Sequence, residues 1–229
     1  MAAERVQGQV VEIGFGQGYG VPLYRDNCDD LTLIDKSGYA IENISKSGFD
    51  LQVIQCKVPP LTMIATESVD TLIAFQFLEH IKDAELFFEE VFRVLRPGGR
   101  AYLTTPNRHR TLIRNPWHFR EYDPGMIRAK TDDHFNRVII KGIHGSEQVE
   151  QYMALNAKAV HRLKSLDPLG LHERVPAWSL KIPYELLNRL NRLRLLKDNR
   201  DLASNIDSSH YSLKDQTDNA LDLWICLEK

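Results

Sequence analysis

The sequence predicts an α/β fold with a Rossmann-like, doubly wound sheet of seven strands. The sheet is expected to be mostly parallel, with an antiparallel last strand and a helical insertion between the last two strands. Three observations support this prediction: residues 10–13 are an apolar run that enters a glycine turn, strand-like runs alternate with helix-like segments up to residue 142, and residues 221–227 are a further apolar run. Such alternation is typical of a parallel sheet covered by helices on both faces.

The glycine turn after the first strand is the predicted seat of a ligand. Glycine adopts backbone angles that other residues avoid, and without a Cβ it lets a ligand lie against the main chain. The acid Glu12 precedes the turn, and Tyr19 stands where a dinucleotide-binding G-x-G-x-x-G motif would have its third glycine. The spacing is instead G-x-G-x-G, with glycine at Gly14, Gly16, Gly18 and Gly20.

The remaining elements of the core follow in chain order. Residues 19–26 are expected to form a first helix, and a second is expected to begin near Lys36 and Ser37. Residues 83–95 predict an amphipathic helix, because apolar side chains recur there at helical spacing, and Pro97-Gly98-Gly99 is expected to end it. The predicted strands after the first cover residues 31–35, 51–55, 69–75, 100–105, 135–142 and 221–227.

A long segment separates the last two predicted strands. We therefore predict a core of residues 1–143 and 219–229 and an inserted helical segment of residues 144–218 that serves as a substrate lid. A loop of that length without structure of its own is uncommon in a compact domain, so helices are expected in it.

Two helices and a connector are expected within the insertion. The helices are predicted over residues 147–166 and 183–196, and residues 198–219 are predicted to be a polar connector. The second helix carries leucines on one face, which either pack in the core or lie on an anionic membrane surface or a nucleic acid. Its cations on the opposite face are Arg189, Arg192, Arg194 and Lys197.

The composition is that of an ordinary globular protein. Of 229 residues, 43% are hydrophobic and 26% are charged, and the formal net charge of -2 gives no general attraction for nucleic acid. No run is long and apolar enough to span a bilayer, and a cytoplasmic location is expected. Cys28, Cys56 and Cys226 match neither a disulfide nor a zinc pattern, so no metal site is expected. The oligomeric state does not follow from the sequence.

Four segments resemble the motifs of a known family. Residues 10–20, 31–35, 70–80 and 95–107 are similar, in this order, to the motifs of class I S-adenosylmethionine-dependent methyltransferases, most of all the type 11 group. The resemblance implies S-adenosylmethionine as cofactor and S-adenosylhomocysteine as its product. It also implies that the glycine turn holds the methionine part, and that the two carboxylate oxygens of Asp35 accept both ribose hydroxyls.

The resemblance extends the expected cofactor site to two further strand ends. Similar enzymes usually place an acid that contacts the adenine amine after the third strand, whereas Cys56 and Lys57 stand here. The fourth motif ends in Glu79-His80, a pair that in such enzymes supports the loop between cofactor and substrate; contact of His80 with the substrate is the alternative. The expected cofactor-binding residues are Glu12, Gly14, Gly16, Gly18, Asp35, Cys56, Lys57, Gln76, Phe77 and His80.

Residues 107–122 are expected to face the substrate. Part of this segment resembles the N-P-x-H-x-R-E-[FY] loop on the substrate side of type 11 enzymes. Its cations and aromatic side chains either clamp a phosphate or carboxylate, stack on a sugar or base, or form a solvated loop. For a hydroxyl acceptor a general base is needed, and His118 and then His109 are the catalytic candidates. The expected substrate-binding residues are Asn107, Arg108, Arg114, Trp117, Arg120 and Tyr122.

The function that the resemblance implies is methyl transfer to a small or medium-sized polar acceptor. That acceptor is expected to be a sugar, a glycan, a lipid-linked compound or another metabolite. Direct displacement at a sulfonium needs alignment above all, which can supply roughly 7–11 kcal/mol. A non-catalytic S-adenosylmethionine-binding protein is the alternative that the missing adenine acid favours. An RNA methyltransferase and an NAD(P) oxidoreductase are further alternatives, opposed by the net charge and by Tyr19 respectively.

Overall fold

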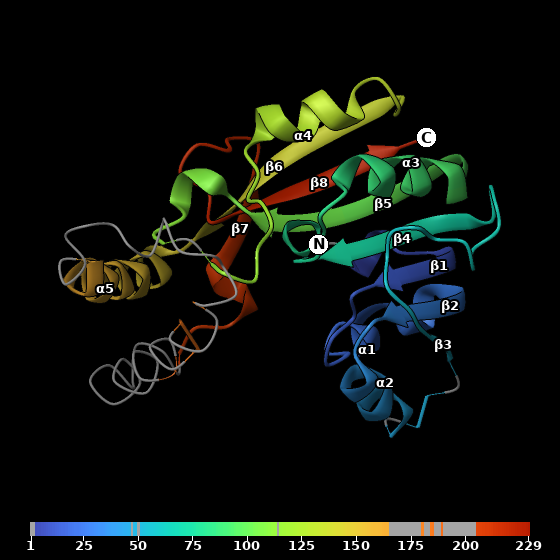
Figure 1. The fold of residues 1–229 in the computed structure, drawn as a ribbon, viewed down its shortest axis with the longest axis horizontal. Coiled ribbons are helices and arrows are strands. Elements are labelled where there is room, and N and C mark those ends of the chain that lie inside the picture. The colour runs from blue at the N-terminus through green and yellow to red at the C-terminus, as the bar shows by residue number, and fades with distance from the viewer. Residues whose placement is uncertain are drawn as a thin grey trace.

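The chain folds around one mixed sheet with helices on both sides (Figure 1). The computed structural model describes residues 3–46, 48–49, 51–113, 115–164, 180, 184–185, 189 and 205–229. The strands lie in the order β3-β2-β1-β4-β5-β8-β6-β7. Their bounds are β1 Gly8–Ile13, β2 Cys28–Asp35, β3 Gln52–Gln55, β4 Val69–Phe75, β5 Leu95–Pro106, β6 Arg137–Gly145, β7 Tyr211–Lys214 and β8 Asp222–Glu228.

Helices connect these strands. Short 3-10 turns stand beside the α-helices, and η3 and η4 directly follow the strands β4 and β5. The α-helices are α1 Val21–Tyr24, α2 Gly38–Ser45, α3 Ala84–Val94, α4 Pro124–Thr131 and α5 Glu147–Lys164; the 3-10 turns are η1 Ala3–Arg5, η2 Arg25–Asn27, η3 Leu78–His80, η4 Arg108–Arg110 and η5 Ser208–His210.

The predicted fold class is confirmed in its main features and wrong in the number of strands. Strands β1 to β5 pair in parallel, and β8 runs antiparallel between β5 and β6. An eighth strand, β7, pairs antiparallel with β6, from Gly142 opposite Lys214 to Gly145 opposite Tyr211. It lies inside the predicted polar connector. Only Leu213 of β7 packs on an apolar cluster, so backbone pairing at the sheet edge, which leaves no hydrophobic pattern, forms this strand.

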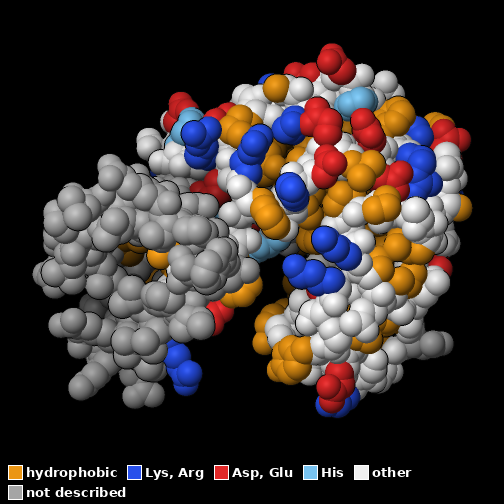
Figure 2. Space-filling view, in the orientation of Figure 1, with side chains coloured by type: hydrophobic (Ala, Val, Ile, Leu, Met, Phe, Trp, Pro, Cys, Tyr) orange, Lys and Arg blue, Asp and Glu red, His pale blue; other side chains and the backbone are white. Residues whose placement is uncertain are grey.

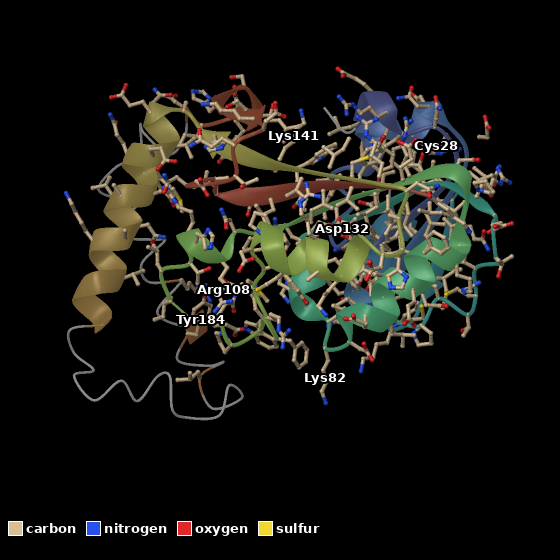
Figure 3. The ribbon with its side chains drawn as sticks, turned by 90° about the horizontal axis from the view of Figure 1, so that it is seen from above. Cys28, Lys82, Arg108, Asp132, Lys141 and Tyr184 are labelled. Atoms are coloured by element: carbon tan, nitrogen blue, oxygen red, sulfur yellow. The ribbon has the colours of Figure 1, made fainter. Side chains whose placement is uncertain are left out.

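Alternate residues of the central strands pack into two separate hydrophobic cores, one on each face of the sheet. Val11 and Leu72 pack with α3 and α4, whereas Val10 and Ile73 pack with α1 and α2. Figures 1 and 3 accordingly show α3 and α4 on one face of the sheet and α1 and α2 on the other. Because successive side chains of a strand point to opposite faces, a strand covered on both sides is apolar throughout. This arrangement leaves the carboxyl ends of the parallel strands free to build a site.

Several element bounds differ from those predicted. Helix α3 ends at Val94, and β5 begins at Leu95, so the Pro97-Gly98-Gly99 turn lies within the strand. The predicted first helix is a single turn, α1, followed by η2, while α2 starts after the N-cap Ser37 as expected. Helix α5 matches the helix predicted over residues 147–166 up to Lys164. The predicted helix over residues 183–196 and its cations lie mostly outside the described residues.

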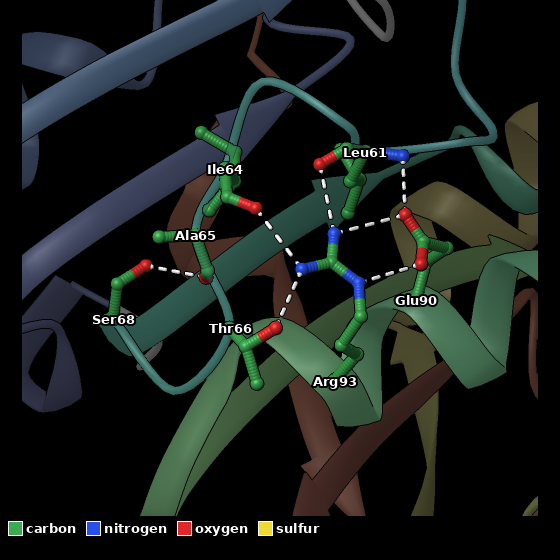
Figure 4. A network of polar contacts seen from close by, with 7 residues as sticks. All are labelled: Leu61, Ile64, Ala65, Thr66, Ser68, Glu90 and Arg93. Atoms are coloured by element: carbon green, nitrogen blue, oxygen red, sulfur yellow. Dashed lines mark hydrogen bonds and ion pairs between the residues drawn. The ribbon is translucent and has the colours of Figure 1, made fainter.

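One charged network fastens the segment before β4 to α3 (Figure 4). The Arg93 guanidinium donates to Glu90 Oε1 at 2.7 Å and to the carbonyl oxygens of Leu61 and Ile64 at 2.9 and 3.1 Å. The Glu90 carboxylate also accepts from the Leu61 amide at 2.6 Å. The hydrogen bond with Arg93 holds the pKa of Glu90 below its usual value. A single side chain thus satisfies two backbone carbonyls of a segment without regular structure.

Replacing Arg93 with methionine should lower the free energy of unfolding by about 2 kcal/mol. The substitution leaves the Leu61 and Ile64 carbonyls and the Glu90 carboxylate without their charged donor. Chemical denaturation measures the loss. The matched control is Arg128→Met, which removes an exposed i,i+4 ion pair with Asp132 and should change stability by less than about 0.5 kcal/mol. Equal losses in the two variants would show that the network adds no stability.

Candidate functional site

The glycine turn joins β1 to α1 at the carboxyl edge of the sheet. The Gly14 amide donates to the Ile34 carbonyl of β2 at 2.7 Å, which draws the turn across the end of the neighbouring strand. A Cβ on Gly14 would lie 2.7 Å from the Phe77 ring, so no larger residue fits there. At Gly16, by contrast, no heavy atom of the described chain lies within 4 Å of a Cβ position. The φ angles are +73° at Gly14, +57° at Gly16 and +72° at Gly18.

Asp35 ends β2 beside this turn. Its Oδ2 accepts from the Gly16 amide at 3.1 Å, and its Oδ1 accepts from the Ser37 amide at 2.8 Å. Each carboxylate oxygen can accept one more hydrogen bond. The open space at Gly16 and the carboxylate that fixes it together form a cradle for a ligand with adjacent hydroxyl groups. These residues therefore fit S-adenosylmethionine, whose ribose carries such a pair.

Glu12 lies in β1, just before the glycine turn. Its carboxyl group is buried and accepts a hydrogen bond from the Tyr24 hydroxyl of α1. Burial raises the pKa of Glu12 to about 7, although the Tyr24 hydrogen bond opposes the shift. The carboxyl group therefore changes charge close to neutral pH, at a position that sequence reasoning assigned to cofactor binding.

We expect the pH dependence of stability to reveal this group. Because the folded protein binds the Glu12 proton more tightly than the unfolded chain, with a pKa of about 7 against 4.5, the associated stability is present in full below pH 4.5 and is lost as pH rises to 7. Over this pH range the free energy of unfolding of the wild type should fall by up to about 3 kcal/mol relative to that of Glu12→Gln, whose side chain does not titrate. Denaturation of both proteins from pH 4.5 to 8 measures the difference. A difference that is constant with pH would contradict the raised pKa.

The third strand end offers different groups from the usual acid. The Cys56 amide donates to the Asp35 carbonyl at 3.0 Å, and the Cys56 side chain packs partly on the core. Burial raises the pKa of its thiol. Lys57 is exposed. Cys56 thus lies next to Asp35, and Lys57 follows it in solvent; contact of either residue with the cofactor stays a prediction.

The fourth strand ends in a strained turn at Gln76. This residue has a φ of +50°, and its amide donates to the Thr104 carbonyl of β5 at 2.9 Å. The next residue, Phe77, covers Gly14 and packs on Phe87 with ring centroids 5.6 Å apart. Gln76 is thus exposed at the edge of the site, whereas Phe77 supports the glycine turn from the side of α3.

Glu79 and His80 form the 3-10 turn η3 beyond this point. Glu79 is only 1% exposed and accepts from the Thr105 hydroxyl at 3.0 Å, and burial raises its pKa to about 7. His80 Nδ1 lies 3.1 Å from the Trp117 carbonyl oxygen, and burial lowers the pKa of its ring. The His80 and His118 rings meet edge to face with centroids 4.9 Å apart. The structure therefore joins the fourth motif to the predicted substrate loop.

His118 is held at both ring nitrogens. Its Nδ1 lies 2.8 Å from Glu121 Oε1, and its Nε2 lies 2.8 Å from Asn115 Nδ2. The Trp117 amide donates to Asn115 Oδ1 at 3.0 Å, which assigns the Asn115 NH₂ group as the donor to Nε2. His118 then carries its proton on Nδ1. Sequence reasoning missed Asn115 and Glu121 as partners of His118, although their spacing of three residues on either side was a usable signal.

A cavity of about 720 Å³ opens beside His118. Arg108 and Arg120 bring positive charge to it, and Arg108 also lies 3.8 Å from Asp123 at the start of α4. Figure 3 shows Arg108 and Cys28 toward opposite ends of the sheet. On the face with α3 and α4, basic, acidic and apolar side chains are interleaved (Figure 2). The described lining residues are Arg108, Thr111, Asn115, His118, Phe119, Arg120, Glu121 and Met126.

The other predicted substrate and catalytic residues lie in different surroundings. Asn107 is buried and donates to the Thr217 and Ala220 carbonyls at 3.0 and 2.9 Å, and Tyr122 lies in the main core. Both join the end of β5 to its neighbours, so their contact with an acceptor stays a prediction. Trp117 and His109 are exposed and outside the described lining of the cavity. Arg114 lies outside the described residues.

The sheet order, with the glycine turn and the acid at the second strand end, is that of an α/β methyltransferase-like fold. Residues 11–103 match the model of the type 11 methyltransferase domain family. Over these residues the chain is similar to the S-adenosylmethionine-dependent methyltransferases of this family, for which S-adenosylmethionine is the methyl donor.

Curated relatives match part of the chain. The chain is 34% identical over 131 residues to a probable S-adenosylmethionine-dependent methyltransferase of Mycolicibacterium smegmatis, covering 55% of this chain and 51% of the relative. A Mycobacterium tuberculosis relative of the same description is 32% identical over 117 residues, covering 49% and 42%. The chain thus spans about half the length of the curated relatives it matches.

The fold comparison covers the whole chain. A Thermotoga maritima methyltransferase described as a possible histamine N-methyltransferase aligns with a TM-score of 0.59 at 15% identity, covering 98% of this chain and 83% of that one. A methyltransferase from Archaeoglobus fulgidus aligns with a TM-score of 0.57 at 15% identity, covering 100% and 89%. At this identity the likeness shows the fold alone. Among the described residues, no helix is both long and apolar enough to cross a membrane.

Proposed function

We propose that this protein transfers a methyl group from S-adenosylmethionine to a small or medium-sized polar acceptor bound in the cavity beside His118. The observation that carries the proposal is the hydrogen bond from the Gly16 amide to the Asp35 carboxylate at the ends of β1 and β2. No heavy atom of the described chain lies within 4 Å of the Gly16 Cβ position, so the backbone there is open to a ligand. Asp35 binds the ribose hydroxyls, and the glycine turn holds the methionine part. When bound, the cofactor supplies an activated methyl group on a sulfonium.

The contribution of the chain is mainly alignment. Holding an acceptor at near-attack distance from the methyl group can account for roughly 7–11 kcal/mol of the barrier. Phe77 covers Gly14 and precedes η3, whose His80 ring contacts His118 of the cavity lining, so η3 links the glycine turn to the cavity. Arg108 and Arg120 bind a polar or anionic part of the acceptor, and the apolar side chains of Phe119 and Met126 contact the rest.

The base for a hydroxyl acceptor is His118. It lines the cavity, and its contact with Glu121 stabilises the protonated ring that forms when it accepts a proton at Nε2. The Asn115 amide must leave Nε2 for this step. His109 is exposed in η4, outside the described lining of the cavity, and serves as base only if the acceptor reaches η4.

The inserted segment acts as the substrate lid. Arg110 of η4 forms an ion pair with Glu150 of α5 at 2.7 Å, which supports a connection between the insertion and the substrate loop. This contact links α5 to the segment that carries Arg108, and we propose that acceptor selection depends on both.

Calorimetric titration with S-adenosylmethionine and S-adenosylhomocysteine, with NAD as control, tests the cofactor assignment. We expect one site with micromolar or tighter affinity for both ligands and no heat with NAD. Absence of binding by either sulfur ligand would overturn the proposal. Binding followed by no methyl transfer across hydroxyl, amine and carboxylate acceptors would instead favour a non-catalytic binding protein.

A further inference from the structure

Three potential metal ligands meet between the fourth motif and the substrate loop. Glu79, His80 and His118 each present a ligand atom, and these atoms lie within 4.8 Å of one another. Two contacts join the contributing segments: the Phe119 amide donates to the Glu79 carbonyl at 2.8 Å, and the Trp117 carbonyl oxygen lies 3.1 Å from Nδ1 of the His80 ring. The cluster is therefore assembled by the fold from two segments that are separate in the sequence.

The two histidines are oriented in the way that metal-binding histidines usually are. His80 Nδ1 faces the Trp117 carbonyl at 3.1 Å, and His118 Nδ1 faces the Glu121 carboxylate at 2.8 Å. A ligating imidazole commonly donates its other N–H to a carbonyl or a carboxylate, which fixes the ring and its tautomer. In both residues this pattern leaves Nε2 as the ligating atom.

The carboxylate of the cluster is also held in place. Glu79 is buried, and the Thr105 hydroxyl donates to its Oε2 at 3.0 Å. That contact occupies one oxygen and leaves Oε1 for a ligand. A buried carboxylate beside two histidines needs a compensating positive charge when it is ionised, and a cation supplies it.

We propose that Glu79, His80 and His118 bind a divalent first-row transition cation such as Zn²⁺. Two imidazoles and one carboxylate suit such metals, and three protein ligands leave coordination positions open. The Asn115 amide, which contacts His118 Nε2, turns away when the cation binds. Since His118 lines the cavity, the cation lies beside the bound acceptor and can polarise its oxygen. With Nε2 coordinated, this polarisation takes the place of proton removal by His118; this last part rests on the proposed function.

Metal titration of the full chain tests the site without reference to methyl transfer. Protein without an affinity tag is stripped with a chelator and titrated with Co²⁺, whose visible absorption reports ligand number, and then with Zn²⁺ in competition. We expect one equivalent to bind, and His80→Ala and His118→Ala each to weaken binding at least tenfold. His109→Ala, which removes an exposed histidine outside the cluster, should leave affinity unchanged.

Glu79→Gln separates loss of metal binding from loss of the folded structure. It keeps an acceptor for Thr105 but removes the charged ligand, so binding should weaken while thermal unfolding stays cooperative. No bound metal, or an affinity that neither histidine substitution changes, would overturn the proposal. S-adenosylhomocysteine titration of the same samples separates this failure from failure of the proposed function, because cofactor binding can persist without a metal.

Discussion

Replacing Asp35 with alanine is expected to weaken S-adenosylhomocysteine binding about 10²- to 10⁴-fold. The substitution removes the carboxylate proposed to accept both ribose hydroxyls, and each hydrogen bond to a charged group contributes about 1.5–3 kcal/mol. It also removes the acceptor that holds the Gly16 amide, so the turn itself loosens. Calorimetric titration of the two proteins gives the ratio of dissociation constants directly.

Two further variants separate these effects. Asp133→Ala removes an exposed acid in the turn after α4 and should leave affinity unchanged. Asp35→Asn keeps the size of the side chain and an acceptor for the Gly16 amide. Its affinity for S-adenosylhomocysteine should therefore lie between that of the wild type and that of Asp35→Ala. Affinity within threefold of wild type in Asp35→Ala would refute the ribose assignment.

A methyl group on Gly16 is expected to abolish measurable cofactor binding while the protein still folds. The residue has a φ of +57°, which costs roughly 1–2 kcal/mol for a residue with a Cβ. Within the described part of the chain nothing blocks that Cβ, so Gly16→Ala should fold. The added methyl group instead fills the space in which the cofactor lies against the main chain. Thermal unfolding and titration measure the two consequences separately.

Gly98→Ala is the matched control for this substitution. Gly98 has a φ of +80°, and no described heavy atom lies within 4 Å of its Cβ position. It stands in the turn at the start of β5, away from the carboxyl edge of the sheet. Gly98→Ala should therefore lose a similar amount of stability and retain cofactor affinity. Equal affinity losses in the two variants would mean that backbone strain alone explains the effect at Gly16.

The positions of the residues proposed to bind the cofactor were more predictable than those of the residues proposed to bind the substrate. Glu12, the glycines and Asp35 lie at the ends of adjacent strands, where local pattern places them, and the parallel order then brings them together. Gln76 and Phe77 follow in the same way from β4. These positions depend on strand ends, which apolar runs and turn residues mark in the sequence.

The substrate side depended on contacts that no local pattern encodes. Asn107 and Tyr122 look like polar loop residues in the sequence, yet a backbone bridge and buried hydrogen bonds draw them inside. The predicted base, His118, is likewise bonded to two neighbours. Polar side chains in a long loop have many partners within reach, so the sequence leaves their pairing open.

By itself, the sequence determined the sheet of mostly parallel strands and the glycine turn with Asp35, because each follows from short-range hydrophobic period and turn chemistry. The methyltransferase class was implied by the resemblance of its motifs to a known family. Only the tertiary structure decided the eighth strand, the inward position of Asn107 and Tyr122, and the meeting of Glu79, His80 and His118. Those features arise from backbone pairing and from polar contacts between distant segments. These contacts form only when the fold has brought distant segments together, so they produce no periodic pattern in the sequence.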